Sequence, residues 1–373
     1  MKLSLLILTI ISTFLTHTTS ASEDPNATGT TEAWKHTGVF LSPARIATLK
    51  ARVEKKIEPT YTAFLKLQEL ADAQLERQPT VPTEWYVPLF YKEPEAHRAA
   101  KAILADDANS SYELALMYSL THKAQYAKAA ARLINGWATG LKSMSRKHDS
   151  TLSFSYHFPA FIFAADLLRS SPDWPQDEQQ RFKTFVRTKA LPMNTMNRNN
   201  NWGNWGLVLA MAGAAYLDDR DLFDRAIERW KEFIDTQIAE DGHLLHEVTR
   251  NKGKGERGVW YSHFSLMPQT IAAEIARVNG VDLFDYRSPK NRTLRQAFEC
   301  LAPWAYDPPS FPYYKGKNPQ GQLGTDYISY WEILNTRWPC PDATAMLSTM
   351  RPLTATHSTP HLTFTHGDLL KDE

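Results

Sequence analysis

The sequence predicts an all-α fold in which helical hairpins follow one another around a toroid or superhelix. Apolar residues recur at helical spacing over most of the 373 residues, and short turns join the helical segments in pairs. No convincing run of alternating strand residues is found. Because the chain has many more helical hairpins than a four-helix bundle contains, we expect one large α/α domain.

The expected helices can be followed along the chain. Ser42 and Pro43 form a typical N-cap and first-turn pair, so the first helix should begin there. Residues 207–217 are rich in Ala and Gly and can pack closely, whereas residues 222–238 have the clearest 3.6-residue apolar face. Further helical segments lie at 112–120, 126–137, 161–168, 266–278 and 327–334.

Longer loops interrupt this pattern and carry many of the Pro, Gly, Asn and aromatic residues. Loops held by a rigid scaffold are where functional residues usually lie, so these loops are the first place to search for a site. They cover about residues 78–95, 143–154, 192–203, 241–259 and 307–324.

The N-terminus has the pattern of a secretory signal peptide. Lys2 precedes an apolar stretch that is too short to span a membrane, and small residues at 19–21 form a cleavage site. We therefore expect a signal peptide at 1–21, an α/α toroid domain at 22–353 and a loosely ordered tail at 354–373. The protein should be secreted, to the extracellular space or, in a bacterium, to the periplasm.

Charge and composition narrow the partners. The 42 Lys+Arg residues nearly balance the 41 Asp+Glu residues, which argues against a nucleic-acid or membrane partner. Aromatic residues make up 12%, and Trp and Tyr faces stack on sugar rings as well as building a core. His243 and His246 have no companion cluster with ligand spacing, so we expect no metal and no cofactor. A monomer is expected.

Two kinds of covalent modification fit a secreted chain. Acceptor sequons begin at Asn26, Asn109 and Asn291, which is compatible with glycosylation. Cys300 and Cys340 could form one disulfide in an oxidising compartment, or could remain two buried thiols.

The first candidate site is the run Asn199–Gly206, which contains four Asn and two Trp at a helix start. Helix capping and turn formation explain some of these Asn residues, but a helix cap requires fewer Asn than the four in this run. Asn200 and Asn201 can donate to a carboxylate or hydroxyl without adding charge, and Trp202 and Trp205 offer stacking faces. We therefore expect this run to contact a ligand.

The second candidate site runs from His243 to His263 and consists of a basic loop followed by the start of a helix that contains Tyr261. A solvated basic loop is the simpler interpretation. However, a cation such as Arg257 near a phenol favours phenolate and would lower the pKa of Tyr261 from about 10 towards neutrality. The tyrosine would then be a usable base.

Two aromatic segments complete the candidates. Tyr156 and His157 stand among aromatic residues at a helix entrance, where the histidine either contacts substrate or is an ordinary near-core residue. Tyr91 belongs to the aromatic stretch 85–92, which could form a wall over a cleft or simply pack between loops.

At these residues the chain resembles the alginate lyase family of polysaccharide lyases. The likeness extends from Gly38 to Tyr261 and is strongest at 200–205 and 256–261. The resemblance implies an incomplete α/α barrel with a deep cleft. It also implies cleavage of uronate polysaccharides by β-elimination, without a hydrolytic water.

The resemblance also implies roles for single residues. Tyr261 matches the tyrosine that takes the C5 proton and returns a proton to the leaving O4, and Asn201 matches the amide that neutralises the uronate carboxylate. The family arginine is Arg250 or Arg257, because this chain carries extra residues before Tyr261. The best-known members have Asn-Asn-His, and this chain has Trp202 at the position of that histidine. Either His157 or His246 supplies the imidazole from elsewhere, or no imidazole is needed.

The expected catalytic residues are therefore Tyr261, Asn201, His246 and Arg257. The expected substrate-binding residues are Asn200, Trp202, Trp205, Tyr156, His157, Arg250 and Tyr91. The expected partner is an acidic polysaccharide, either alginate, glucuronan or another polyuronate. An α/α-toroid glycoside hydrolase with two carboxylates and a non-catalytic glycan-binding protein are the competing hypotheses.

Overall fold

The computed structural model describes residues 34–250, 253–314, 325–354, 357 and 359–367. The expected signal peptide at 1–21 and the sequon at Asn26 lie outside these residues. In the described part of the chain, no helix is both long enough and apolar enough to cross a bilayer.

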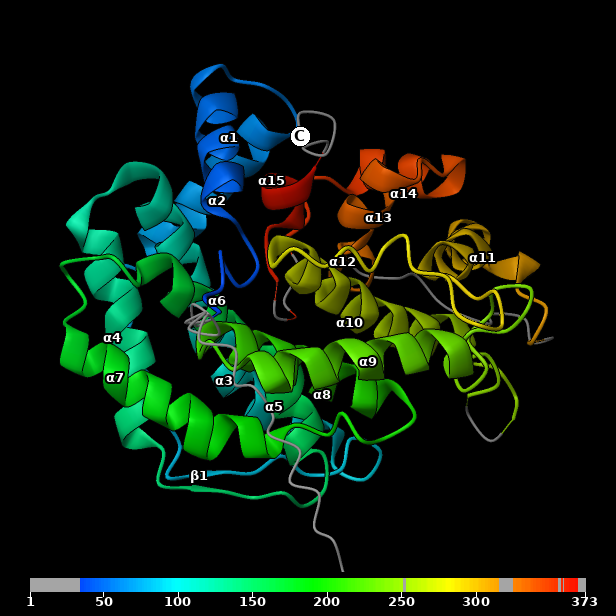
Figure 1. Ribbon diagram of the computed structural model, residues 1–373, viewed down its shortest axis with the longest axis horizontal. Helices are drawn as coiled ribbons and strands as arrows, with labels where there is room; N and C mark the ends of the chain where they lie inside the picture. The colour runs from blue at the N-terminus through cyan, green and yellow to red at the C-terminus, as the bar shows by residue number, and fades with distance from the viewer. Residues whose placement is uncertain (1–33, 251–252, 315–324, 355–356, 358, 368–373) are drawn as a thin grey trace, which may run out of the picture. The chain divides into compact units, whose positions relative to one another are not determined.

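Fifteen α-helices make up most of the described chain (Figure 1). Their bounds are α1 Pro43–Glu54, α2 Thr60–Ala73, α3 Pro94–Thr121, α4 Ala124–Gly140, α5 Ser150–His157, α6 Pro159–Leu168, α7 Gln176–Phe185, α8 Asn201–Tyr216, α9 Arg220–Gln237, α10 Gly258–Val278, α11 Leu294–Tyr306, α12 Thr325–Ile328, α13 Trp331–Arg337, α14 Pro341–Met350 and α15 Leu362–His366. Two short strands, β1 Glu84–Trp85 and β2 Ser143–Met144, pair in parallel.

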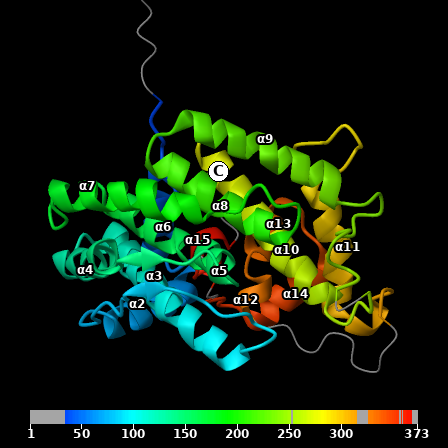
Figure 2. The ribbon, with the colours of Figure 1, turned by 90° about the horizontal axis from the view of Figure 1, so that it is seen from below.

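Helix composition separates an inner from an outer set of helices. Nearly every residue of α6, α8 and α10 is buried, which is typical of helices enclosed by others. By contrast, α9 buries one stripe, including Phe223, Ile227, Trp230 and Ile234, and exposes charged residues on its other face. Figure 2 shows α9 along the outer edge, with α8 beneath it.

The inner helices pack in sequence, and the outer helices cover them. Helix α3 packs on α6, α6 packs on α8, and α8 packs on α10. The hairpin partners α4 and α9 cover α3 and α8 from outside, while α11 packs on α10. This arrangement is the α/α toroid that the helical hairpins predicted, although the sequence pattern did not predict α2, α5, α7, α11, α14 and α15.

Loop 86–93 is anchored near the start of α5. The Ser150 hydroxyl accepts the Val87 N–H at 2.9 Å, and the Asp149 carboxylate accepts the Phe90 N–H at 2.9 Å. Helix α5 begins inside the predicted loop 143–154, and nearly all of its residues are buried, including Ser150, Thr151 and Ser153. These bonds fix the loop that presents Tyr91.

The expectation of a loosely ordered tail at 354–373 is wrong for the residues the structure describes there. Helix α15 is buried and packs on α2 and α13. The Thr363 hydroxyl donates to Glu332 at 2.6 Å, and His361 and His366 pair with Glu113 and Glu274 at 2.9 and 3.1 Å. Buried carboxylates satisfy the polar groups that made this segment look solvated, so the folded domain continues to residue 367.

The structure bears on the possible disulfide and on two of the glycosylation sequons. Cys300 and Cys340 are both free thiols. The sequon at Asn109 lies within α3, where the side chain is half-buried and the next two serines are buried, so this amide is a poor glycan acceptor. Asn291 is exposed in a turn and stays a candidate acceptor.

Candidate active site

A cavity of about 590 Å³ opens at the N-terminal ends of α3, α8 and α10. Its volume is in the usual range for a ligand site. The residues that line it are Leu89, Phe90, Tyr91, Lys92, His97, Arg98, Lys101, Asp149, Leu152, Tyr156, Asn201, Trp202, Arg250, Arg257, Trp260, Tyr261, Phe264, Tyr327 and His357.

The start of α8 places Asn201 on the cavity wall. Asn200 is the N-cap, and its side-chain oxygen accepts the Trp202 N–H at 3.1 Å. One turn deeper, the Asn204 amide donates to Gln237 at 2.9 Å and to the Ser265 hydroxyl at 2.5 Å, which ties α8 to α9 and α10. The first turn of α8 is therefore fixed relative to the first turn of α10.

A buried carboxylate, Glu247, joins Asn201 to Arg250. The Asn201 Nδ2 donates to both Glu247 oxygens, at 3.0 and 3.2 Å, and the Arg250 Nε donates to Glu247 Oε2 at 2.8 Å. Glu247 is 1% exposed, so the two donors neutralise a charge that would otherwise be costly to bury. The arrangement fixes an amide and a guanidinium at the cavity.

Tyr261 lies in the first turn of α10 and faces the same cavity. The Arg250 guanidinium carbon lies 4.6 Å from the centre of the Tyr261 ring. The Tyr261 hydroxyl shares a hydrogen bond with the Tyr91 hydroxyl. Arg257 lies against the ring of Tyr91, with its guanidinium carbon 5.5 Å from the ring centre. The tyrosine pair is thus flanked by two arginines.

The pKa of Tyr261 corrects the sequence-based expectation. Burial and then the hydrogen bond with Tyr91 raise this pKa well above the usual value for tyrosine, although Arg250 and Arg257 act to lower it. The sequence analysis considered only a nearby arginine and so expected a lowered pKa. In this structure Tyr261 is therefore a neutral phenol at pH 7.

The lining of the cavity is cationic. It includes Lys92, Arg98, Lys101, Arg250 and Arg257. Asp149 is the one carboxylate among the described lining residues, and its oxygens face the Phe90 N–H and His97. With a net charge of only +1 for the whole chain, this local excess favours an anionic ligand.

Of the residues predicted from the sequence, the cavity brings together Tyr261, Asn201, Arg257, Trp202, Tyr156, Arg250 and Tyr91. Four others do not line it. Asn200 is occupied as a helix cap, and His246 is exposed outside the cavity next to the inward-facing Glu247. Trp205 and His157 are buried among aromatic rings, which removes both from the ligand-facing surface.

The sequence analysis assigned no role to several residues that the structure brings to the site. The three-residue spacing of Glu247 and Arg250 could have indicated an ion pair. Lys101 comes from an α3 segment that has no local motif. Tyr327 and His357 come from a distant part of the chain, and nothing in the neighbouring sequence points to the cavity.

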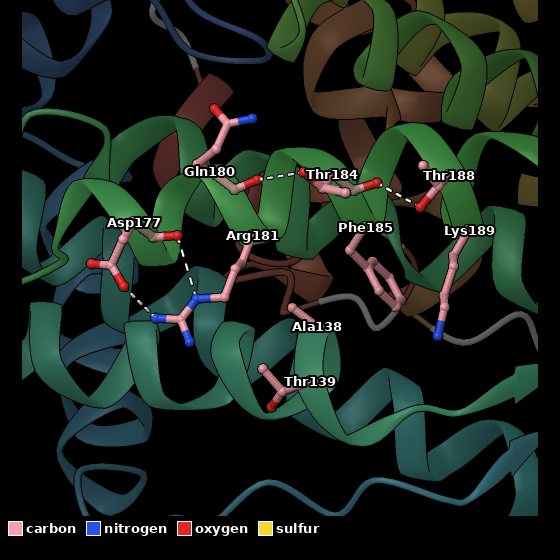
Figure 3. A pocket seen from close by; sticks show the side chains of 9 residues that line it. All are labelled: Ala138, Thr139, Asp177, Gln180, Arg181, Thr184, Phe185, Thr188 and Lys189. Atoms are coloured by element: carbon pink, nitrogen blue, oxygen red, sulfur yellow. Dashed lines mark hydrogen bonds and ion pairs between the residues drawn. The ribbon is translucent and has the colours of Figure 1, made fainter.

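A second groove lies on the outside of the toroid, between α4 and α7 (Figure 3). Most of its polar side chains bond within their own helices or to nearby backbone. Arg181 pairs with Asp177 at 2.6 Å, and Lys189 donates to the Leu141 carbonyl at 2.7 Å. This groove therefore lacks a set of polar groups directed at a common point.

Metal binding has no support in the described part of the chain. Among the described residues, no group of three or more His, Cys, Asp or Glu side chains is arranged so that it could hold a metal ion.

Fold and site together define an α/α-toroid protein with a cationic cavity centred on a tyrosine. The model of the alginate lyase family matches residues 53–311, which is more than half of the chain. The chain belongs to the alginate lyase family.

The curated relatives that the chain matches are alginate lyases. The alginate lyase of Pseudomonas entomophila (strain L48) is 28% identical over 202 residues, which cover 53% of this chain and 52% of that protein. The alginate lyase of Cobetia marina is 30% identical over 165 residues, which cover 43% and 41%. The chain thus spans about half the length of these relatives, or less.

Solved structures show the likeness of the fold. Alginate lyase A1-III from Sphingomonas species A1 has a TM-score of 0.67 at 19% identity, covering 82% of this chain and 91% of that one. A variant of A1-III complexed with a tetrasaccharide gives a TM-score of 0.68, also at 19% identity, with 82% and 90% covered. An alginate lyase from Bacteroides ovatus has a TM-score of 0.62 at 18% identity, covering 89% and 98%. These matches confirm the all-α toroid.

Proposed function

We propose that this protein is a polysaccharide lyase that cleaves a uronate-containing polysaccharide, alginate or a related polyuronate, by β-elimination. The observation that carries the proposal is the position of the Tyr261 phenol, in one cavity with Asn201, Arg250 and Arg257. Membership of the alginate lyase family and the cationic lining support an acidic glycan as substrate.

The proposed reaction begins at the C5 proton, which is α to the sugar carboxylate. Asn201 and an arginine bind the carboxylate and stabilise the negative charge that moves onto it as the proton leaves. The Tyr261 phenolate takes this proton. The electron pair then forms the C4=C5 double bond, the C4–O4 bond breaks, and the Tyr261 hydroxyl returns the proton to O4. No water is consumed.

The base must form from a phenol whose resting pKa is high. Tyr91 is 69% exposed on its loop, so a sugar chain can displace it from Tyr261 without opening the core. Displacement removes the hydrogen bond that favours the neutral phenol, while Arg250 and Arg257 continue to favour phenolate. Tyr91 is therefore proposed to bind substrate and to control the acidity of Tyr261.

The geometry favours Arg250 over Arg257 as the arginine next to the reacting atoms. Arg250 lies on the Tyr261 ring and is fixed by Glu247, whereas Arg257 lies against Tyr91 and Phe90. We assign Arg250 to the reaction and Arg257 to the binding of a neighbouring sugar carboxylate. His246 is not retained as a catalytic residue because it does not line the cavity.

The hydrolase alternative is less well supported. A glycoside hydrolase needs two carboxyl groups flanking the scissile bond, commonly about 5–10 Å apart. Asp149 is the one carboxylate among the described lining residues, and Glu247 is buried behind Asn201 and Arg250. The site therefore offers amide, guanidinium and phenol chemistry in place of a carboxylate pair.

Incubation of the protein with a panel of polyuronates tests the proposal. Polymannuronate, polyguluronate, glucuronan and glycosaminoglycans would be followed by ultraviolet absorbance, because a lyase product has a C4=C5 bond conjugated to the carboxylate. We expect absorbance to rise with at least one polymer. New reducing ends without ultraviolet absorbance would indicate a hydrolase, and saturable binding without product would indicate a glycan-binding protein.

Export is proposed from the sequence alone. Fusion of residues 1–21 to a reporter enzyme should send the reporter to the medium or periplasm. Retention of the reporter inside the cell would contradict this assignment.

A further inference from the structure

A histidine from the C-terminal segment lies on the wall of the catalytic cavity. His357 follows α14, beyond residues 53–311 that the family model matches. It is 5% exposed and lines the same cavity as Tyr261 and Asn201. The two imidazoles that the sequence suggested, His157 and His246, do not line this cavity.

Aromatic neighbours fix the orientation of the His357 ring. It lies nearly parallel to the rings of Trp205 and His157, at 20° and 13°, with centroid distances of 5.6 and 5.9 Å. Tyr156 and Tyr327 contact it at tilted angles, with centroids 5.4 and 5.6 Å away. Trp205 and His157 therefore have a physical role, since they support a ring that reaches the cavity.

The surroundings of His357 match those of a bound sugar. Tyr156, Phe264 and Tyr327 give this end of the cavity an aromatic surface, on which the apolar face of a pyranose can stack. An imidazole N–H in such a wall is a directional donor, and a hydrogen bond to a carboxylate is stronger than one to a neutral group. A ring fixed in advance loses little conformational entropy when it binds.

We propose that His357 contacts substrate directly and donates a hydrogen bond to a uronate carboxylate in the cavity. The inference rests on the proposed lyase function and adds a binding residue from the C-terminal segment. Helix α15, which begins five residues after His357, packs on α2 and α13.

Two substitutions separate a substrate contact from a structural role. His357→Phe keeps an aromatic ring for stacking on Trp205 but removes the donor, whereas His357→Gln keeps an N–H donor. We expect His357→Phe to lower kcat/KM on the preferred polyuronate by about 100-fold, and His357→Gln to recover about tenfold of that loss. Both variants should have thermal midpoints close to wild type.

His361→Gln is the matched control. This histidine is in the same segment and is 1% exposed, but it pairs with Glu113 and does not line the cavity. Its substitution should lower the thermal midpoint and leave kcat/KM of the folded protein within about threefold. If His357→Phe keeps kcat/KM within threefold, or if Phe and Gln cause equal losses together with a lowered thermal midpoint, the inference is overturned.

The test remains decisive in two difficult cases. If His357→Phe does not fold, His357→Leu, which also lacks a donor, replaces it, and a loss of tenfold or more supports the inference while a loss within threefold overturns it. If wild type turns over no polyuronate, the proposed function fails separately. Calorimetric titration with a mannuronate tetramer then decides the inference, since a His357 contact requires tenfold weaker binding by His357→Phe and equal affinity excludes it.

Discussion

At the scale of single residues, the acidity of one phenol is set by three neighbours. Burial and Tyr91 raise the pKa of Tyr261, while Arg250 and Arg257 lower it. The sequence indicated the arginines, which are close in the chain. It could not indicate Tyr91, which is 170 residues away, or the extent of burial. The direction in which the pKa of Tyr261 moves therefore depends on tertiary contacts.

Tyr91→Phe tests this balance. Because the Tyr91 hydroxyl favours the neutral form of Tyr261, its removal should lower the pKa of Tyr261. Activity through phenolate rises with pH, so the rising limb of the kcat/KM profile should move to lower pH. On that limb kcat/KM should gain about tenfold for every pH unit that the limb moves. A limb that stays in place or moves to higher pH would show that Tyr91 does not control Tyr261.

We infer that Glu247 is a positioning residue, since it holds the Asn201 amide and the Arg250 guanidinium and does not line the cavity. Glu247→Gln should lower kcat by about 10- to 100-fold, because small displacements of catalytic groups are costly. KM should change less than kcat. The free energy of unfolding should fall by about 1–3 kcal/mol.

Glu240→Gln is the control for Glu247, because Glu240 is exposed on the preceding turn. It should leave both kcat and stability unchanged. Equal changes in kcat and KM for Glu247→Gln, or full activity with lowered stability, would argue against a positioning role.

The position of a residue along its helix decides whether a residue predicted from the sequence lines the cavity. Asn201 and Tyr261 lie in the first turns of α8 and α10, where a helix start faces the cavity. Trp205 lies on the same face as Asn201 but one turn deeper, and it therefore enters the core. The two tryptophans of the Asn-rich run look alike in sequence, and only depth distinguishes Trp202 from Trp205.

At the scale of elements, the packing of α15 depends on a buried histidine, His366, that must stay neutral. Burial lowers the pKa of His366 to about 4, and burial also lowers the pKa of His263 in α10 to about 3. Hydrogen bonds from Arg277 and His366 hold the pKa of Glu274 below its usual range, although burial alone would raise it. The docking of α15 thus involves groups that titrate differently in the unfolded chain.

Stability should therefore fall in mild acid. Below about pH 6.5 the unfolded chain protonates these histidines while the folded chain does not, so the free energy of unfolding decreases as pH falls towards 4. Each histidine should account for about 2 kcal/mol between pH 6.5 and pH 5. Urea unfolding at a series of pH values measures this slope.

The variants His366→Gln and His122→Asn test whether His366 causes the decrease of stability at low pH. His366→Gln should make the decrease of stability shallower, because one buried imidazole is removed. His122 is exposed at the end of α3, so His122→Asn should keep the wild-type slope. Identical slopes for wild type and His366→Gln would exclude His366 as a source of the pH dependence.

Element prediction succeeded where helices have strong apolar periodicity and failed where context overrides composition. The periodic segment 222–238 corresponds closely to α9. The Thr/His/Pro-rich C-terminal segment has a polar composition, yet buried carboxylates provide partners for its polar groups. Such long-range pairing leaves no periodic signal in the sequence.

At the scale of the whole molecule, charge is distributed unevenly although it almost cancels. The chain has a net charge of +1, while five cationic side chains and one carboxylate line the cavity among the described residues. Whole-chain composition disfavoured a nucleic-acid partner, but it could not reveal a local concentration of cationic side chains. The cationic side chains come together only when loop 86–93, α3 and the segment before α10 meet.

Salt should weaken the binding of a polyanionic substrate. We expect KM for a polyuronate to rise about threefold or more between 50 and 300 mM NaCl, because added ions screen the cavity charges, while kcat changes little. A methyl-esterified polymer, which carries little charge, serves as the control for binding. Salt-independent KM values would contradict an electrostatic role of the lining.

The proposed role of Tyr261 is tested most directly by the turnover of Tyr261→Phe on the preferred polyuronate, measured by ultraviolet absorbance. Tyr306→Phe, at an exposed site, is the control. Because the phenol is proposed to act as both base and acid, kcat should fall by about 1000-fold or more, while oligosaccharide affinity stays within about threefold. A Tyr261→Phe protein that retains more than a tenth of wild-type kcat would contradict the account.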